Sequence, residues 1–405
     1  MSQDYPTISL DEAWRRIAAA VRPLPPRLIP LAEALGCVLA QDVQATENMP
    51  PFAASAMDGY AVIAADATPS RRVIGEQTAG RQLPLRVEPG AAARIMTGAP
   101  LPEGADAVIK VEDSVEQDGW VRFTAAVPAG RDVRPAGQDV AAGEVVLERG
   151  AVLGPAEIGL LATVGRIAVL AHPRPRVAVM ATGDELVAPD QQPGPGQIRD
   201  SNSYALLAAV QAAGCQAIHL GRIPDDEQAL RAAMLSGLAQ ADALITSGGV
   251  SMGTRDLVKP LLEELGAVHF GQVASRPGKP FTFATVQGKP VFGLPGFPVS
   301  SLVTFENMVR PALRIMGGHA KLRRPRVLAR LSHAIRHAPD RTEFQRAVVV
   351  QRDGAYWAAT TGVQVSGRLK SMAGANALLE LPAGVSDFAQ GQEAVAILIT
   401  LPEVD

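Results

Sequence analysis

The chain has 405 residues, more than a single hydrophobic core usually supports, so two or more domains are expected. Hydrophobic residues make up 47% and charged residues 20%, with a net charge of −3, which excludes a largely disordered chain and a general basic excess for nucleic acid. The two cysteines, Cys37 and Cys215, form no CxxC pair, so neither a disulfide framework nor a structural zinc site is predicted, and a cytoplasmic location is expected. The first residues do not resemble a signal peptide, and no apolar run approaches the length of a membrane span.

Residues 9–21 form the first predicted element, an amphipathic helix. Ser9 followed three residues later by Glu12 is a capping-box pattern. Apolar residues then recur at helical spacing. This stripe consists of Leu10, Trp14, Ile17 and Val21. Because a domain edge is not expected to cover the whole stripe, a homodimer with a shared cleft is hypothesised.

Three further regions differ in their patterns. From residue 41 to 150, short β-rich runs separated by Gly, Pro or Asp predict one or two mainly β regions. From 176 to 316, strands alternate with helices, which predicts a doubly wound α/β domain with a largely parallel sheet. After residue 321 the pattern is β-rich again and predicts a small barrel or sandwich.

Polar and glycine-rich loops follow the predicted strands of the α/β region. They are TGDE (182–185), PDD (224–226), TSGGVSMG (246–253) and LPGFP (294–298). Ligands of open α/β sheets bind beyond the carboxyl ends of the strands, and glycines let backbone amides approach an anion. Carboxylates beside such a site favour a divalent cation, and Arg276 and Lys279 follow just downstream. The combination predicts a nucleotide or oxyanion ligand bound with Mg²⁺.

Each residue of this set also has a structural interpretation. SGGVSMG matches neither the dinucleotide-binding nor the P-loop pattern and is compatible with a tight turn. Asp184 and Glu185 are compatible with charges at a helix start, Asp225 or Asp226 with a helix N-cap, and Lys279 with solvated surface. The functional interpretation rests on all of them falling at the same end of one sheet.

Eight segments in order carry a resemblance to a known family. They are PPFAASAMDGYAV (50–62), RIMTGAPLPEGADAVIKVED (94–113), MATGDEL (180–186), IRDSNSY (198–204), TSGGVSMG, RPGKP (276–280), GLPGFPVSSLVTFE (293–306) and SMAGANALLELP (371–382). Together they resemble the MoeA family of molybdopterin molybdenumtransferases, whose relatives include the E domain of gephyrin and a plant molybdenum-insertase domain. The resemblance covers nearly the whole chain.

The resemblance implies a fold that combines α/β and β domains in an elongated, multidomain homodimer. It implies a discontinuous dimerisation domain (1–50 and 136–172), a small β domain with the MDGYAV and TGAP motifs (51–135), a MogA-like α/β molybdopterin-binding domain (173–320) and a C-terminal β-barrel (321–405). The active cleft is then expected between subunits.

The resemblance also implies the reaction, in which molybdate is inserted into adenylylated molybdopterin with release of AMP, assisted by Mg²⁺. A molybdopterin adenylyltransferase is a further implied partner, whereas nucleic acid and membranes are not. The implied catalytic residues are Asp58, Thr97, Asp139, Glu185, Asp225 and Asp256, of which Glu185, Asp225 and Asp256 are the expected metal ligands. The implied substrate-binding residues are Thr182, Gly183, Ser247, Gly248, Gly249, Ser251, Gly253, Arg276, Lys279, Pro280, Pro295, Pro298, Ser300, Arg346 and Ser371.

Three of these positions keep a second interpretation. Asp-Gly is a strong turn signal, so Asp58 taken alone is expected to be a turn residue. Arg346 and Ser371 are expected to be exposed residues of a barrel strand and a turn, unless the fold brings them to the cleft.

The chain departs from the family pattern at three positions. Phe297 stands where many relatives have Asn in LPGNP, and it lacks the amide hydrogen bonds of Asn. Gln272 and Arg276 stand where some relatives have lysine; the first change loses a charge, and the second keeps it.

The alternatives to molybdenum insertion are molybdopterin adenylylation and a non-catalytic scaffold. The additional β domains oppose the former, and retention of the carboxylates opposes the latter.

Overall fold

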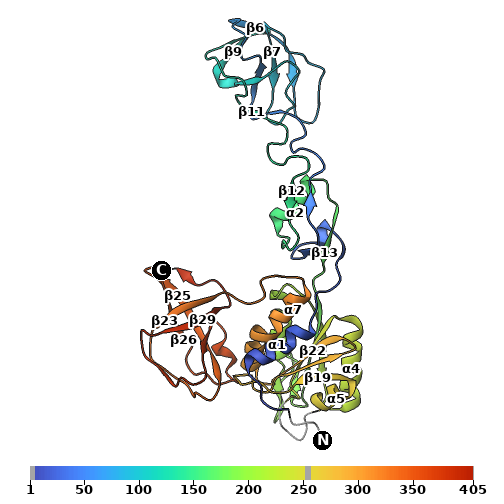
Figure 1. The fold of residues 1–405 in the computed structure, drawn as a ribbon, viewed down its shortest axis with the longest axis vertical. Helices are drawn as coiled ribbons and strands as arrows, with labels where there is room; N and C mark the ends of the chain where they lie inside the picture. Colours follow the sequence, from blue (N-terminus) through green and yellow to red (C-terminus); the bar gives the residue numbers. More distant parts are fainter. Residues whose placement is uncertain (1–4, 251–256, 405) are drawn as a thin grey trace. The chain divides into compact units, whose positions relative to one another are not determined.

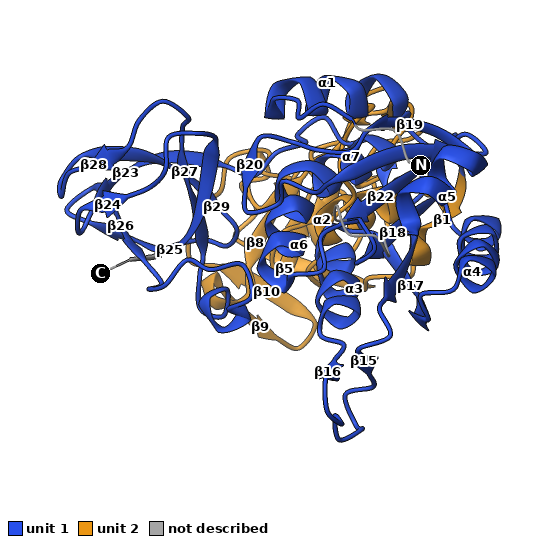
Figure 2. Ribbon diagram, turned by 90° about the horizontal axis from the view of Figure 1, so that it is seen from below, with its two compact units in different colours: residues 1–27, 36–38, 171–405 blue, residues 28–35, 39–170 orange. Residues whose placement is uncertain are grey.

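A computed structural model describes residues 5–250 and 257–404. The chain divides into two compact units (Figure 2). The first comprises residues 1–27, 36–38 and 171–405, and the second comprises residues 28–35 and 39–170. Each unit has its own hydrophobic clusters and is described separately.

The larger unit contains the expected α/β domain (Figure 1). Among the described residues its sheet has six strands, in the spatial order β17 (Gln216–Ile223), β14 (Arg176–Thr182), β18 (Ala243–Ser247), β22 (Lys289–Leu294), β21 (Thr282–Val286) and β19 (Gly266–Phe270). The first four strands are parallel, and the last two are antiparallel to their neighbours. The prediction of a doubly wound α/β domain is therefore confirmed.

Helices cover both faces of this sheet, because alternate residues of a buried strand point to opposite faces. On one face Val177 and Val179 of β14 join a cluster with helices α1 (Leu10–Ala20), α3 (Asn202–Ala212) and α7 (Arg310–Met316). On the other face Ala178 and Met180 join a cluster with α4 (Glu227–Gln240) and α5 (Val258–Leu265).

The helical segment over 298–316 contains a π-helical turn. It consists of α6 (Pro298–Thr304), the π-helical turn Phe305–Val309 and α7. The Arg310 amide donates to the Phe305 carbonyl, five residues back. Pro311 has no amide to offer the preceding turn, and the wider turn accommodates this break in the hydrogen-bond ladder.

The first predicted helix is confirmed as α1, and Ser9 accepts the Glu12 amide at 3.1 Å. The expectation that its apolar stripe lacks full cover within one chain is wrong. Ile17 and Val21 are buried in the cluster under the α/β sheet, and Leu10 and Trp14 pack against that cluster. The stripe therefore does not support a dimer.

The predicted C-terminal β domain is a closed five-stranded barrel among the described residues. The strands pair around the ring in the order β25 (Thr342–Arg352), β26 (Ala355–Thr360), β23 (Arg326–Leu331), β29 (Glu393–Leu398) and β27 (Ala377–Leu381), and β27 pairs with β25 to close it. The interior is filled by small and branched residues, including Ala347, Val349 and Leu379. The short strand β20 (Ser275–Arg276) of the RPGKP segment adds to β25.

The second unit contains the expected small β domain. Its main sheet has the order β8 (Ala107–Lys110), β5 (Gly59–Val62), β7 (Ala91–Ile95), β6 (Ser70–Gln77), β10 (Trp120–Phe123) and β9 (Ser114–Gln117). The unit also holds α2 (Pro155–Thr163), the pair β3 (Val43–Gln44) with β12 (Val145–Leu147), and the pair β4 (Ala54–Ser55) with β11 (Val133–Arg134). Gly59 is required where β5 meets β8, since a Cβ there would lie 2.0 Å from the Ile109 carbonyl oxygen.

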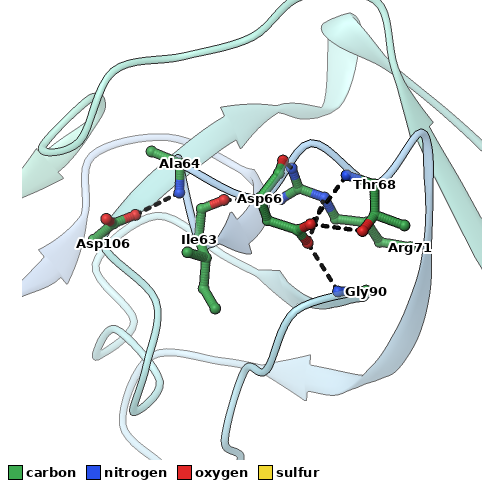
Figure 3. A network of polar contacts seen from close by, with 7 residues as sticks. All are labelled: Ile63, Ala64, Asp66, Thr68, Arg71, Gly90 and Asp106. Carbon is green, nitrogen blue, oxygen red and sulfur yellow. Dashed lines mark hydrogen bonds and ion pairs between the residues drawn. The ribbon is translucent and has the colours of Figure 1, made fainter.

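A polar network holds together the loop that follows β5 (Figure 3). The Asp66 carboxylate accepts bonds from the Thr68 amide and hydroxyl and from the Gly90 amide, and lies 3.3 Å from Arg71 Nε. The side chains of Asp66 and Arg71 are 6% and 7% exposed. Their opposite charges thus compensate each other in a nearly buried site.

Candidate active site

Thr182 and Asp225 meet at the carboxyl ends of two neighbouring parallel strands. β14 ends at Thr182, whose register partner on β17 is Ile223, so the PDD loop begins beside the TGDE loop. The buried Thr182 hydroxyl donates to Asp225 Oδ1 at 2.5 Å. Asp226 instead accepts the Ala229 amide at 2.8 Å and caps α4. The N-cap interpretation therefore holds for Asp226, whereas Asp225 faces the TGDE loop.

Two more carboxylates lie at this edge. Asp184 Oδ1 accepts the Asp225 amide at 3.1 Å. The Glu185 carboxylate packs over Gly183, where an added Cβ would lie 2.5 Å from Oε2. Asp184, Glu185 and Asp225 form no ion pair with a basic side chain of residues 5–250 or 257–404, so their negative charge is unmatched there.

The glycine loop after β18 passes directly against Thr182. Gly248 and Gly249 have φ values of +93° and +66°, a region that L side chains rarely occupy. A Cβ at Gly248 would lie 2.5 Å from the Thr182 carbonyl oxygen, and one at Gly249 would lie 2.6 Å from Val258 Cγ2. Both glycines are required for this close approach. Ser251, Gly253 and Asp256, which were also assigned to the site, lie outside the described residues.

Asn202 joins the glycine loop to the LPGFP loop. Its Nδ2 donates to Ser247 Oγ at 2.8 Å and to the Gly296 carbonyl at 2.7 Å. The Ser247 hydroxyl in turn lies 3.4 Å from the Pro295 carbonyl. Pro295 and Ser300 are buried, so they shape the loop from beneath. Asn202 lies in the IRDSNSY motif, but it was not among the predicted site residues.

The start of α3 is capped by Asp200 and contains buried polar atoms without a hydrogen-bond partner among the described residues. Ser201 makes no side-chain capping bond, whereas Asp200 Oδ1 accepts the Ser203 amide at 3.0 Å. Asp200 Oδ2, Asn202 Oδ1 and Ser203 Oγ are buried, with no hydrogen-bond partner among the described residues. Such atoms have hydrogen-bonding capacity left for a ligand or water.

The RPGKP segment carries two cationic side chains, of which Arg276 forms an ion pair and Lys279 is exposed. Arg276 Nη2 binds Asp340 Oδ1 at 3.0 Å. Lys279 is exposed, and its amine forms no ion pair within residues 5–250 and 257–404. Gly278, with φ +101°, lets the turn before Lys279 and Pro280 pack against Thr304.

Arg346 and Ser371 are buried, so the expectation that they are exposed is wrong. Arg346 Nε donates to Ser371 Oγ at 3.0 Å. Nη1 donates to the Gln364 carbonyl, and Nη2 to the carbonyls of Val363 and Val365. Burial lowers the pKa of Arg346, and the nearby Glu343 opposes that shift. Since a guanidinium has five N–H donors, four of which are used here, Arg346 mainly holds the loop over 363–371.

Comparison with known proteins identifies the family. Residues 8–165 match the model of the MoeA N-terminal region (domain I and II), 178–315 match a probable molybdopterin-binding domain, and 328–399 match the MoeA C-terminal region (domain IV). Molybdopterin molybdenumtransferase 2 of Mycobacterium tuberculosis is 39% identical over 402 residues, covering 95% of this chain and 98% of that protein. The chain belongs to the MoeA family.

Further comparisons extend this result to the fold of the family. The molybdopterin molybdenumtransferase of Haemophilus influenzae is 35% identical over 380 residues, covering 92% of this chain and 94% of that protein. The crystal structure of a molybdopterin biosynthesis MoeA protein from Pyrococcus horikoshii matches with a TM-score of 0.81 and 32% identity, covering 98% of this chain and all of that one. The carboxylate edge, the glycine loop and the LPGFP loop all fall within the region that matches the molybdopterin-binding model.

In the MoeA N-terminal region of this chain, Asp58 and Thr97 are in contact. Asp58 Oδ1 accepts the Thr97 amide and the Thr97 hydroxyl, each at 2.7 Å. These two bonds, the amide bond first, lower the pKa of the exposed Asp58 carboxyl. Gly59 begins strand β5 and has no positive φ, so Asp58 binds the TGAP loop from the start of this strand rather than forming an Asp-Gly turn, and its side chain is exposed. Asp139 pairs at 2.7 Å with Arg134.

Proposed function

We propose that this MoeA-family protein is a molybdopterin molybdenumtransferase, an enzyme that inserts molybdate into adenylylated molybdopterin and releases AMP. The observation that carries the proposal is the juxtaposition of a left-handed glycine loop with the unmatched carboxylates Asp184, Glu185 and Asp225. A polyanionic substrate fits the amides of such a loop, but it fits these carboxylates only when a cation lies between them.

The donor set fits Mg²⁺, which prefers carboxylate oxygens. No cluster of three or more metal-binding side chains is found in the described parts of the chain. The proposed set therefore includes Asp256, outside those parts, together with Glu185 and Asp225. When bound, the metal would neutralise phosphate charge and polarise a phosphoryl oxygen.

Roles for the chain's own residues follow from their positions. Thr182 orients the Asp225 carboxylate through its hydroxyl. Gly248 and Gly249 allow the backbone to approach a phosphate, and the exposed Lys279 provides positive charge for an oxyanion. Arg346 and Ser371, with one guanidinium donor left over, act chiefly by holding the loop over 363–371.

We also propose a role for the N-terminal region and a homodimeric assembly. In the smaller unit, the exposed residues Asp58, Thr97 and Asp139 are further proposed catalytic residues. The smaller unit exposes several large apolar side chains, which supports an interface between two copies. They are Leu28, Leu35, Val145, Val152 and Ile167. Light scattering should give twice the mass of one chain at micromolar concentration.

We further propose how the substrate is supplied and where the reaction takes place. A separate adenylyltransferase would supply the adenylylated substrate, and the reaction would take place in the cytoplasm. No helix of the described residues is long and apolar enough to cross a membrane.

The decisive experiment incubates the purified protein with molybdopterin-AMP, molybdate and Mg²⁺. The expected result is molybdate-dependent release of AMP together with cofactor that activates an apo-molybdoenzyme. Consumption of ATP and molybdopterin, with adenylylated molybdopterin as product, would instead identify an adenylyltransferase. Absence of both reactions, with the fold intact, would contradict the enzymatic proposal.

A further inference from the structure

Phe297 is an exposed aromatic residue at the rim of the proposed site. It lies in the LPGFP loop between β22 and α6, and 62% of its surface is accessible. Phenylalanine is usually buried, so a ring held in solvent beside a binding site suggests a contact with something apolar.

The loop that carries Phe297 touches the glycine loop. The preceding residue, Gly296, accepts a hydrogen bond from Asn202, which also binds Ser247. A Cβ on Gly296 would lie 3.8 Å from Gly248 Cα. The backbone next to the Phe297 ring is therefore in contact with the loop that is proposed to bind the phosphates.

One side of the ring is supported by the loop over 363–371. A Cβ on Gly367 would lie 3.6 and 3.7 Å from Phe297 Cδ1 and Cε1, and the Val299 amide donates to the Ser366 carbonyl at 3.2 Å. The buried Arg346 holds this supporting loop by its carbonyls. The loop over 363–371 thus lies beside one side of the ring, and most of the ring's surface remains accessible.

We propose that Phe297 is a specificity-determining residue that stacks on a flat heteroaromatic ring of the substrate. This inference rests on the proposed function, whose substrate contains two such rings, the pterin and the adenine. Stacking is the interaction that an accessible phenyl ring offers, and it replaces the hydrogen bonds that Asn would offer at this position. The ligand class is therefore a planar, nitrogen-containing heterocycle attached to a phosphate.

The test measures binding of AMP and of a free pterin separately, by calorimetry with the full-length protein. Phe297→Leu keeps an apolar side chain and removes the π face, and it should weaken binding of one of the two probes about fivefold. Phe297→Tyr keeps the ring and should stay within about twofold of the unmodified protein. Trp120→Leu, which removes another exposed aromatic ring from the β domain, is the matched control and should change neither affinity.

The outcomes distinguish the pterin from the adenine as the stacked ring. They also distinguish failure of the stacking role from failure of the proposed function. Loss confined to the pterin assigns the stacking to the pterin, and loss confined to AMP assigns it to the adenine. If the unmodified protein binds the probes and Phe297→Leu binds both equally well, the stacking role is wrong while the proposed function stands. If the unmodified protein binds neither probe, the stacking role and the proposed substrate class fail together.

Discussion

Acidic residues of the β domain have more polar partners than the acidic residues at the carboxyl edge of the α/β sheet. In the β domain, Asp66 lies against Arg71 and accepts three further hydrogen bonds, and Asp58 accepts two bonds from Thr97. Each of these carboxylates has partners within its own unit. Their negative charge stabilises loops that join strands.

At the edge of the α/β sheet the carboxylates have fewer partners. Asp225 accepts one hydroxyl bond, Asp184 accepts one amide bond, and neither they nor Glu185 form an ion pair within the described residues. Bringing like charges together without a counter-charge costs free energy. The difference teaches that Asp66 of the β domain chiefly maintains structure, whereas the α/β acids leave charge for a ligand.

The largest effect is expected from breaking the buried pair of the β domain. Asp66→Ala leaves Arg71 nearly buried without its counter-charge, and should lower the free energy of unfolding of this domain by about 4 kcal/mol. Trp120 lies on β10, which pairs with the strand β6 that carries Arg71. Its fluorescence during guanidinium unfolding reports the loss of stability, once Trp14 and Trp357 are replaced by Phe so that Trp120 is the sole tryptophan.

The matched control is an exposed pair of the same domain. Arg86 and Glu103 are 67% and 72% exposed, and Glu103→Ala should cost less than about 1 kcal/mol. Replacing both partners in Asp66→Ala/Arg71→Met should recover part of the stability. Equal effects of Asp66→Ala and Glu103→Ala would show that burial does not distinguish the two pairs.

The next largest effect separates two adjacent residues at the α/β edge. Asp225→Asn removes charge from the proposed cation site and should slow AMP release at least 100-fold, about 2.7 kcal/mol in activation free energy. Asp226→Asn should retain nearly full activity, because Asn caps a helix about as well as Asp. Steady-state rates across a Mg²⁺ titration decide this. Similar losses in both variants would remove the distinction between site and cap.

These two aspartates also illustrate what could be predicted from the sequence. Alternating strands and helices were sufficient to predict the α/β domain, since hydrophobic periodicity determines which faces are buried. The same pattern placed the PDD loop at the site edge. The pattern alone left open whether Asp225 or Asp226 caps the helix, because that depends on the direction of single side chains; the family resemblance implied Asp225 for the site, and the structure shows Asp226 as the cap.

The remaining differences arise from long-range packing. The stripe of α1 is covered by residues from 177 onwards, far away in the sequence. Arg346 was expected to be exposed because charged residues usually are, yet loop carbonyls some 20 residues downstream bind it. Asn202 joins two loops that follow different strands. None of these partners lies within the local windows on which sequence patterns rely.

Acid should reveal the stabilising role of Asp66. Burial raises the pKa of this carboxyl, but the bonds from Thr68 and Gly90 and the charge of Arg71 outweigh burial and lower the pKa to about 2. A lowered pKa contributes stability that is complete above the unfolded value near 4 and is lost as the pH falls towards 2. The β domain should lose about 2 kcal/mol over this window. Asp66→Asn should remove this component of the pH dependence, and an unchanged acid profile would contradict it.

The smallest effect tests the two Thr–Asp pairs directly. Thr182→Val keeps the shape of the buried side chain but removes the only hydroxyl bond to Asp225 found in the described residues, and should slow AMP release about tenfold, or about 1.4 kcal/mol. Thr182→Ser keeps the hydroxyl and should remain within about twofold. In the exposed pair, Thr97→Val leaves the amide bond to Asp58 in place, so the pKa of Asp58 should rise only part of the way to its usual value, which a carboxyl NMR titration measures. If Thr182→Val were as active as Thr182→Ser, the hydroxyl would not be what positions Asp225.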